Sequence, residues 1–278
     1  MDNSLLHDEH VLLGAMTDEG VDGRSMPTSY PTSDVQAAFA EGAALVDLTG
    51  LGSRLISGAS SESFVSAAFT CRNLSVGEVA LTAVLTGDGA LASIALLART
   101  GDREYACWDL LGRGDTLFAW LGFVAGVEHG GERAFPEVAL EDASEALVPL
   151  LLWGPQAPAV LADYLREQEL PEVGRIDGYA LDDIGCLVAS LPMGAGNCFL
   201  VLVPPRYARV LWRSFLSFSV VTPVAPADLL NHLAEVLPHL AGLPMSMGKL
   251  TVTKDELAKA GLMRDTLDFV GARGLTEG

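Results

Sequence analysis

The chain has 278 residues, of which 50% are hydrophobic and 19% charged, and its formal net charge is −19. This composition excludes a disordered chain, and the charge argues against nucleic acid or an anionic membrane as partner, because both would be repelled. No apolar run reaches the roughly 20 residues of a membrane span, and the N-terminus lacks the basic and apolar regions of a signal peptide. The four cysteines are scattered, so we expect a cytoplasmic protein with buried, reduced thiols.

The first half of the chain alternates between helical and strand patterns. Residues 6–14 predict a short helix, and residues 25–33, rich in Pro, Ser and Thr, predict a loop. Asp34 is placed to cap a helix that Gly42 ends. The other elements expected before residue 128 are strands at 44–49, 53–57, 79–85, 94–98 and 104–108 and helices at 62–69 and 116–127.

The second half repeats this pattern after an acidic, turn-rich stretch at residues 128–145, where we place a domain boundary. It predicts strands at 147–152, 186–191 and 198–203 and helices at 157–168 and 207–216. Strand–helix–strand–strand–helix is the order of the ferredoxin-like split β-α-β unit. We therefore expect an α+β fold of two such domains, at residues 1–145 and 146–245, with residues 246–278 as a C-terminal tail.

The most informative stretch is residues 77–90, which read GEVALTAVLTGDGA. Its first part predicts an amphipathic strand, and Gly87-Asp88-Gly89 predicts a tight turn. Without gaps, the stretch resembles the segment GQAxYTLLLNEDGG of the tetrahydrofolate-binding aminomethyltransferases, the T-proteins of the glycine cleavage system. The strand and turn therefore match a family whose members carry a working site directly after this segment.

Six more blocks resemble the same family in the correct order along the chain. They are residues 6–15 (LYDxHxxLGA in the family), 43–52 (AGLFDVSHMG), 69–75 (LLTNDVS), 151–161 (LALQGPKAxxVL), 199–204 with Trp212 (FEIYVP followed by LW) and 268–271 (DFIG). The resemblance implies ferredoxin-like domains around a central pocket, with tetrahydrofolate as cofactor and a small methyl or aminomethyl donor as substrate. It also implies a C-terminal barrel after the last block, and we expect this third domain to be missing here.

The departures from the family pattern fall on the residues that would do the chemistry. The family's acidic pair, which orients and moves a proton beside the folate, falls on Ser93 and Ile94, and neither can take that role. The family's Tyr becomes Leu81, the Met of its His-Met pair becomes Leu51, and the Glu that would bond the pterin becomes Leu200. The standard acid is thus absent, and no catalytic residue can be assigned.

The candidates for lining the pocket are Leu51, Leu81, Asp88, Ser93 and Leu200. For Asp88 we favour capping of the turn over contact with a ligand. His7 and His10 have a spacing that permits metal chelation, but no further ligand cluster is visible, so we favour a solvated terminus and expect no metal.

Two hypotheses about function remain open. One is tetrahydrofolate-dependent one-carbon or methyl transfer, as the resemblance implies. The other is a non-catalytic T-like subunit or adaptor that works with a protein partner chain, comparable to the gamma subunit of heterotetrameric sarcosine oxidase. The apolar replacements favour the second hypothesis, and the family resemblance favours the first.

Overall fold

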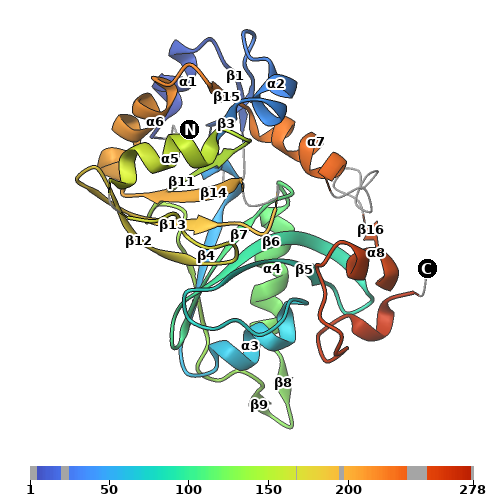
Figure 1. The fold of residues 1–278 in the computed structure, drawn as a ribbon. Helices are drawn as coiled ribbons and strands as arrows, with labels where there is room; N and C mark the ends of the chain where they lie inside the picture. Colours follow the sequence, from blue (N-terminus) through green and yellow to red (C-terminus); the bar gives the residue numbers. More distant parts are fainter. Residues whose placement is uncertain (1–4, 20–24, 167, 194–196, 237–248, 277–278) are drawn as a thin grey trace. The chain divides into compact units, whose positions relative to one another are not determined.

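The computed structural model describes residues 5–19, 25–166, 168–193, 197–236 and 249–276. It divides into two compact units, drawn in Figure 1. Unit 1 combines residues 1–50 with 144–232, and unit 2 combines residues 51–143 with 233–278. Each unit contains a six-stranded sheet with helices, so the predicted α+β class is confirmed.

The units are not the consecutive segments that we expected at 1–145 and 146–245. Residues 1–50 join the second half of the chain because β3 (Ala43–Asp47) pairs antiparallel with β11 (Val148–Trp153). The last described residues are not a separate tail, because β16 (Leu250–Thr251) pairs with β6 (Ala90–Gly101) of unit 2. Both departures from the expected domain bounds come from pairing between strands that are far apart in the sequence, and such pairing leaves no pattern in the local sequence.

Unit 1 is built on a sheet in the order β12-β13-β14-β11-β3-β15. Its remaining strands are β12 (Ile176–Leu181), β13 (Ile184–Ser190), β14 (Cys198–Val203) and β15 (Val221–Pro223). Its helices are α1 (His7–Leu12), α2 (Val35–Ala40), α5 (Ala157–Leu165) and α6 (Ala208–Leu216), and α7 (Pro226–Val236) begins in this unit. Strand β12 is not among the expected strands. It lies at the exposed edge of the sheet, so its middle residues are mostly exposed and do not form the apolar run that would predict a strand.

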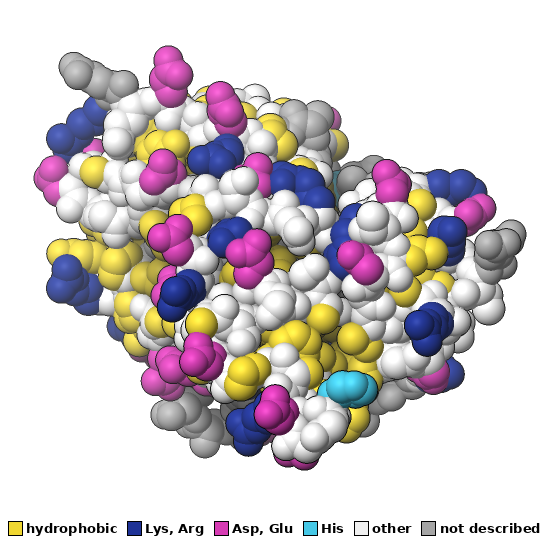
Figure 2. Space-filling model, turned by 90° about the horizontal axis from the view of Figure 1, so that it is seen from below, with side chains coloured by type: hydrophobic (Ala, Val, Ile, Leu, Met, Phe, Trp, Pro, Cys, Tyr) yellow, Lys and Arg dark blue, Asp and Glu magenta, His cyan; other side chains and the backbone are white. Residues whose placement is uncertain are grey.

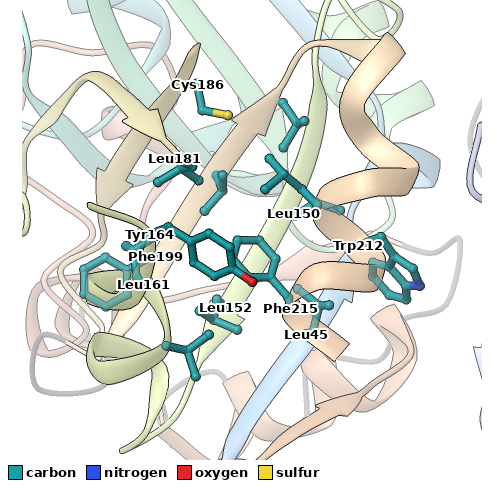
Figure 3. Packing of buried hydrophobic residues seen from close by; sticks show 14 of the residues in the cluster. Leu45, Leu150, Leu152, Leu161, Tyr164, Leu181, Cys186, Phe199, Trp212 and Phe215 are labelled. Carbon is teal, nitrogen blue, oxygen red and sulfur yellow. The ribbon is translucent and has the colours of Figure 1, made fainter. Parts of the chain in front are cut away.

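Helices α5 and α6 cover one face of this sheet. Phe199 on β14 and Leu150 on β11 pack there with Leu161 of α5 and Phe215 of α6 (Figure 3). The expected loop at 25–33 is wrong in its first part, since β2 (Ser25–Ser29) pairs with β1 (Met16–Glu19) in a small antiparallel hairpin.

Unit 2 is built on a sheet in the order β10-β4-β7-β6-β16, with β5 also paired to β6. Its other strands are β4 (Ser53–Ser57), β5 (Val79–Leu85), β7 (Glu104–Asp109) and β10 (Ala139–Asp142). Its helices are α3 (Ser61–Ala68), α4 (Gly114–Ala125) and α8 (Lys254–Lys259), and the short strands β8 (Glu128–His129) and β9 (Glu132–Arg133) form a hairpin. Phe64 of α3 and Leu117 of α4 pack on the same sheet face, against Val84 and Leu97.

Arg264 holds the C-terminal segment to unit 2. Its side chain is only 10% exposed, and its guanidinium donates to the carbonyl oxygens of Phe69, Cys71 and Ser66 at 2.8, 2.9 and 2.6 Å. The Nε atom donates to Asp268 at 2.7 Å. One buried cation thus satisfies three backbone carbonyls that would otherwise lack partners.

Candidate functional site

Strands β5 and β6 carry three of the predicted site positions, and their register separates these positions. Leu81 lies opposite Leu96, and Ile94 lies opposite Ala83, so Leu81 and Ile94 share one sheet face. Ser93 lies opposite Val84, which belongs to the core under the helices. Ser93 and Ile94, the positions that the resemblance aligns with the family's acidic pair, therefore point to opposite faces, and only Ile94 shares a face with Leu81.

The sheet face that carries Leu81 is apolar in its centre. Besides Leu81 and Ile94 it holds Ala83, Leu96 and, across from Leu96 on β7, Trp108. All five side chains are buried. The four aliphatic side chains carry no polar atom, and the indole N–H of Trp108 can donate a hydrogen bond but does not titrate, so this part of the face has no group for acid–base chemistry.

On the opposite face, Ser93 is bonded to a buried acid that the sequence analysis did not single out. Its hydroxyl donates to Asp109 Oδ1 at 2.5 Å, and the backbone N–H groups of Leu111 and Arg113 donate to the same carboxyl at 3.3 and 2.7 Å. Asp109 ends β7 and precedes α4, so its carboxyl caps the connection between them. The available signal was an Asp directly after the apolar strand 104–108 and before a glycine-rich turn.

Burial raises the pKa of Asp109 to about 6, against the lowering effect of the hydrogen bonds from Ser93 and the backbone. The folded protein therefore keeps this proton between pH 3.8, the usual value, and about 6, where the unfolded chain has released it. Because the folded state then binds more protons, the free energy of unfolding should fall by about 3 kcal/mol as the pH rises through this window.

Urea unfolding at a series of pH values between 4 and 7 measures this effect, with Asp109→Asn as the comparison. The pH-dependent fall in the free energy of unfolding should disappear in Asp109→Asn. In Ser93→Ala the fall should extend to higher pH, because the hydrogen bond from the Ser93 hydroxyl, which lowers the pKa of Asp109, is gone. Parallel curves for the wild type and Asp109→Asn would contradict this assignment.

Asp88 lies in the turn after β5 and serves the turn itself. Its carboxyl accepts from the Thr86 hydroxyl at 2.6 Å and from Lys249 Nζ at 2.7 Å, and these bonds hold the pKa of Asp88 well below its usual range. Gly89 in this turn has φ +81°, and a Cβ there would lie 2.3 Å from the carbonyl carbon of Gly274. The Gly-Asp-Gly turn therefore works as a backbone contact for the C-terminal segment.

The remaining two candidates, Leu51 and Leu200, are buried in different units. Leu200 lies opposite Leu151 on one side and Ala189 on the other, so it shares its sheet face with apolar neighbours. Leu51 ends the short 3-10 helix Thr49–Leu51 that follows β3. No described hydrogen bond joins either side chain to a polar group, as expected for leucine.

Unit 1 contains a buried polar cluster, which corrects our expectation of a solvated N-terminus at His10. His10 Nε2 lies 3.0 Å from Asp47 Oδ2, and the Tyr30 hydroxyl lies 2.8 Å from His10 Nδ1. Asp47 Oδ1 also accepts from the backbone N–H and the hydroxyl of Thr49, at 2.9 and 2.5 Å. Trp212 covers the imidazole edge-on, with 5.1 Å between ring centroids. All of these polar side chains are buried.

This cluster joins two separate blocks of the sequence that resemble the family. His10 comes from the block at 6–15, and Asp47 and Thr49 come from the block at 43–52. The His10 imidazole, on helix α1, lies between Asp47 and Tyr30. Because Asp47 ends β3 and also accepts from the backbone of Thr49, these bonds fix α1 to the end of β3 and to the turn that follows. The imidazole, carboxylate and hydroxyl groups of the cluster all have partners inside the protein, so its role is to position the backbone; among the described residues, the buried Nε1 of Trp212 has no hydrogen-bond partner.

The comparison with known families agrees with the order of these blocks. The sequence model described as the GCVT N-terminal domain matches residues 6–220. The chain belongs to this family. The resemblance predicted from the seven sequence blocks is thereby confirmed at the level of the family.

One solved structure supports the assignment of the fold. The chain is similar to the crystal structure of glycine cleavage system aminomethyltransferase T from Bartonella henselae, with a TM-score of 0.71 and 20% identity over 98% of this chain and 73% of that one. It also matches the heterotetrameric sarcosine oxidase from Corynebacterium sp. U-96 in complex with pyrrole 2-carboxylate, with a TM-score of 0.42 and 17% identity over 78% of this chain and 95% of that chain. No curated protein matches the sequence significantly.

Among the described residues, no three His, Cys, Asp or Glu side chains are grouped to hold a metal ion. Every helix in the same part of the chain is too short or too polar to cross a membrane. The polar groups around Asp109 and those around Asp47 are engaged within their own units.

Proposed function

We propose that this chain is a non-catalytic member of the GCVT family that acts as a subunit or adaptor with a protein partner. The observation that carries the proposal is the face shared by Leu81 and Ile94, where the family has a Tyr and one member of its acidic pair. An apolar pair cannot accept and return a proton during transfer. The acid that is present, Asp109, lies on the other face and is occupied by Ser93 and two backbone donors.

The residues at these positions do not fit tetrahydrofolate. A pterin ring carries several hydrogen-bonding groups that need partners when they leave water. Leu81 and Ile94 offer no such partner, and each polar group left without one costs about 1–3 kcal/mol. We therefore derive no transfer step through folate.

One-carbon transfer remains the second candidate, because the match to the GCVT N-terminal domain runs over residues 6–220 and through both units. In that case tetrahydrofolate, or another methyl acceptor, would bind beside Leu81. The donor would be a small methylated or aminomethylated molecule. The chain would then need a proton-handling group other than Ser93 or Ile94.

Calorimetric titration with tetrahydrofolate separates the two candidates. We expect no saturable heat up to roughly 1 mM ligand, which corresponds to less than about 4 kcal/mol of binding free energy. The aminomethyltransferase T from Bartonella henselae serves as a control in the same buffer, because it shares the fold. Saturable binding to the wild type that Leu81→Trp weakens would reject the adaptor role and support the transferase.

A further inference from the structure

Helix α4 is apolar on the side that faces the solvent as well as on the side that faces the sheet. Leu117, Leu121 and Val124 are buried against the core of unit 2. On the outer side, Phe123 is 64% exposed. The half-buried Trp120, which packs against the core of unit 2, stacks on Phe123 with 5.2 Å between ring centroids. Hydrophobic side chains are exposed among charged ones on the side of the molecule that carries β8 and β9 (Figure 2). Phe123 and Val127, four residues apart around the C-terminal end of α4, are thus the large apolar side chains that this side leaves exposed, and adjacent exposed apolar side chains of this kind mark contact surfaces.

The outer side of α4 carries no side chain at Gly122, and the space beside this residue is open. An added Cβ at Gly122 would meet no atom within 4 Å, and its φ is not left-handed, so the fold of this chain does not require glycine there. Glycine within a helix costs about 1 kcal/mol relative to alanine. A missing side chain beside Phe123 allows a second backbone to approach the helix closely.

The charges around this side of α4 select the kind of partner. Asp115 at the start of the helix and Glu128 and Glu132 just beyond its end are all exposed, and Arg133 is the nearby cation in the hairpin. A second copy of the chain would bring the same acidic residues together, against a net charge of −19 on each copy. A membrane with anionic lipids would be repelled for the same reason.

We propose that the α4 outer surface, formed by the exposed residues Ala119, Gly122, Phe123 and Val127, binds an amphipathic helix of a partner protein whose apolar stripe is flanked by Lys and Arg. The apolar stripe covers Phe123 and packs closely at Gly122, and the basic flanks meet Asp115 and Glu128. This inference rests on the adaptor role proposed above and names the surface that carries it out.

A fluorescein-labelled helical peptide made only of leucine and lysine tests the surface on the full-length chain by fluorescence anisotropy. Phe123→Glu should weaken peptide binding at least tenfold, because it places a charge in the centre of the apolar contact. Leu12→Glu is the matched control: Leu12 is 74% exposed on α1, and the variant adds the same charge elsewhere. Equal effects of the two substitutions would overturn the proposal, since they would show only non-specific attraction to an acidic protein.

Further measurements test whether a second copy of the chain or a lipid surface covers the α4 outer surface instead, and whether the substitutions disturb folding. Gly122→Gln should weaken peptide binding like Phe123→Glu while leaving the circular dichroism spectrum unchanged, because no atom lies near that position. A dimer in sedimentation velocity that Phe123→Glu dissociates would overturn the proposal in favour of a second copy. Co-sedimentation with phosphatidylcholine vesicles that the same substitution abolishes would overturn it in favour of a lipid surface. The folate titration tests the adaptor role and the peptide titration tests the surface, so the two can fail separately.

Discussion

Replacing Asp47 by alanine should lower the free energy of unfolding by about 3–5 kcal/mol. The carboxyl is buried and accepts from His10 and from both the backbone N–H and the hydroxyl of Thr49. Its removal leaves these donors buried without an acceptor, and each then costs the free energy of taking it out of water. Urea unfolding followed by far-UV circular dichroism measures the loss as a lower midpoint concentration.

The ion pair between Asp8 and Arg209 provides the control for this experiment. Its oxygen and nitrogen are 2.8 Å apart, but both side chains are more than half exposed. Asp8→Ala should therefore change stability by less than about 1 kcal/mol. Tyr30→Phe should lower the free energy of unfolding by an intermediate amount, because it removes only the Tyr30 hydroxyl that is hydrogen-bonded to His10. If Asp47→Ala costs no more than Asp8→Ala, the buried cluster does not hold α1 in place.

Replacing Arg264 by methionine should also cost about 3–5 kcal/mol, since three carbonyl oxygens lose their donor at once. Methionine keeps most of the side-chain volume, so the loss reports the hydrogen bonds to Phe69, Cys71 and Ser66 more than the packing. Arg264→Lys should recover only part of the loss, because an ammonium group cannot reproduce the planar fork of the guanidinium. Hydrogen exchange of residues 250–276 measures how far this segment loosens.

Lys249→Met is the matched control in the same segment. Lys249 bonds to Asp88 at 2.7 Å, with both side chains 61% exposed. The small contribution of exposed ion pairs predicts almost no change in unfolding or in exchange. Equal loosening of the segment by Arg264→Met and Lys249→Met would show that the buried guanidinium is not what attaches it.

Much of the architecture could be predicted from local patterns. The strand at 79–85 has the predicted bounds, and the Gly87-Asp88-Gly89 turn follows it as expected. The preference for turn capping at Asp88 agrees with its bonds to Thr86 and Lys249. Family membership was also readable, because it rests on short blocks whose order does not depend on the fold.

The orientation of the candidate site could not be read in the same way. Strand β6 is buried along most of its length on both faces, so it shows no alternation of polar and apolar residues that would assign Ser93 and Ile94 to a face. The pairing of β5 with β6 also shifts in register between Val84 and Leu85, and the residue types there do not predict this shift. For the same reason, the sequence could not show that Ile94 rather than Ser93 shares the face of Leu81.

The sequence by itself determined the α+β class and the GCVT family, because residue type and spacing are local properties. Only the tertiary structure decided which residues meet. It joined Ser93 to Asp109 across two strands and His10 to Asp47 across 37 positions. Such pairs form when sheet register and helix packing bring distant segments within hydrogen-bond reach, and burial then makes each partner necessary to the other.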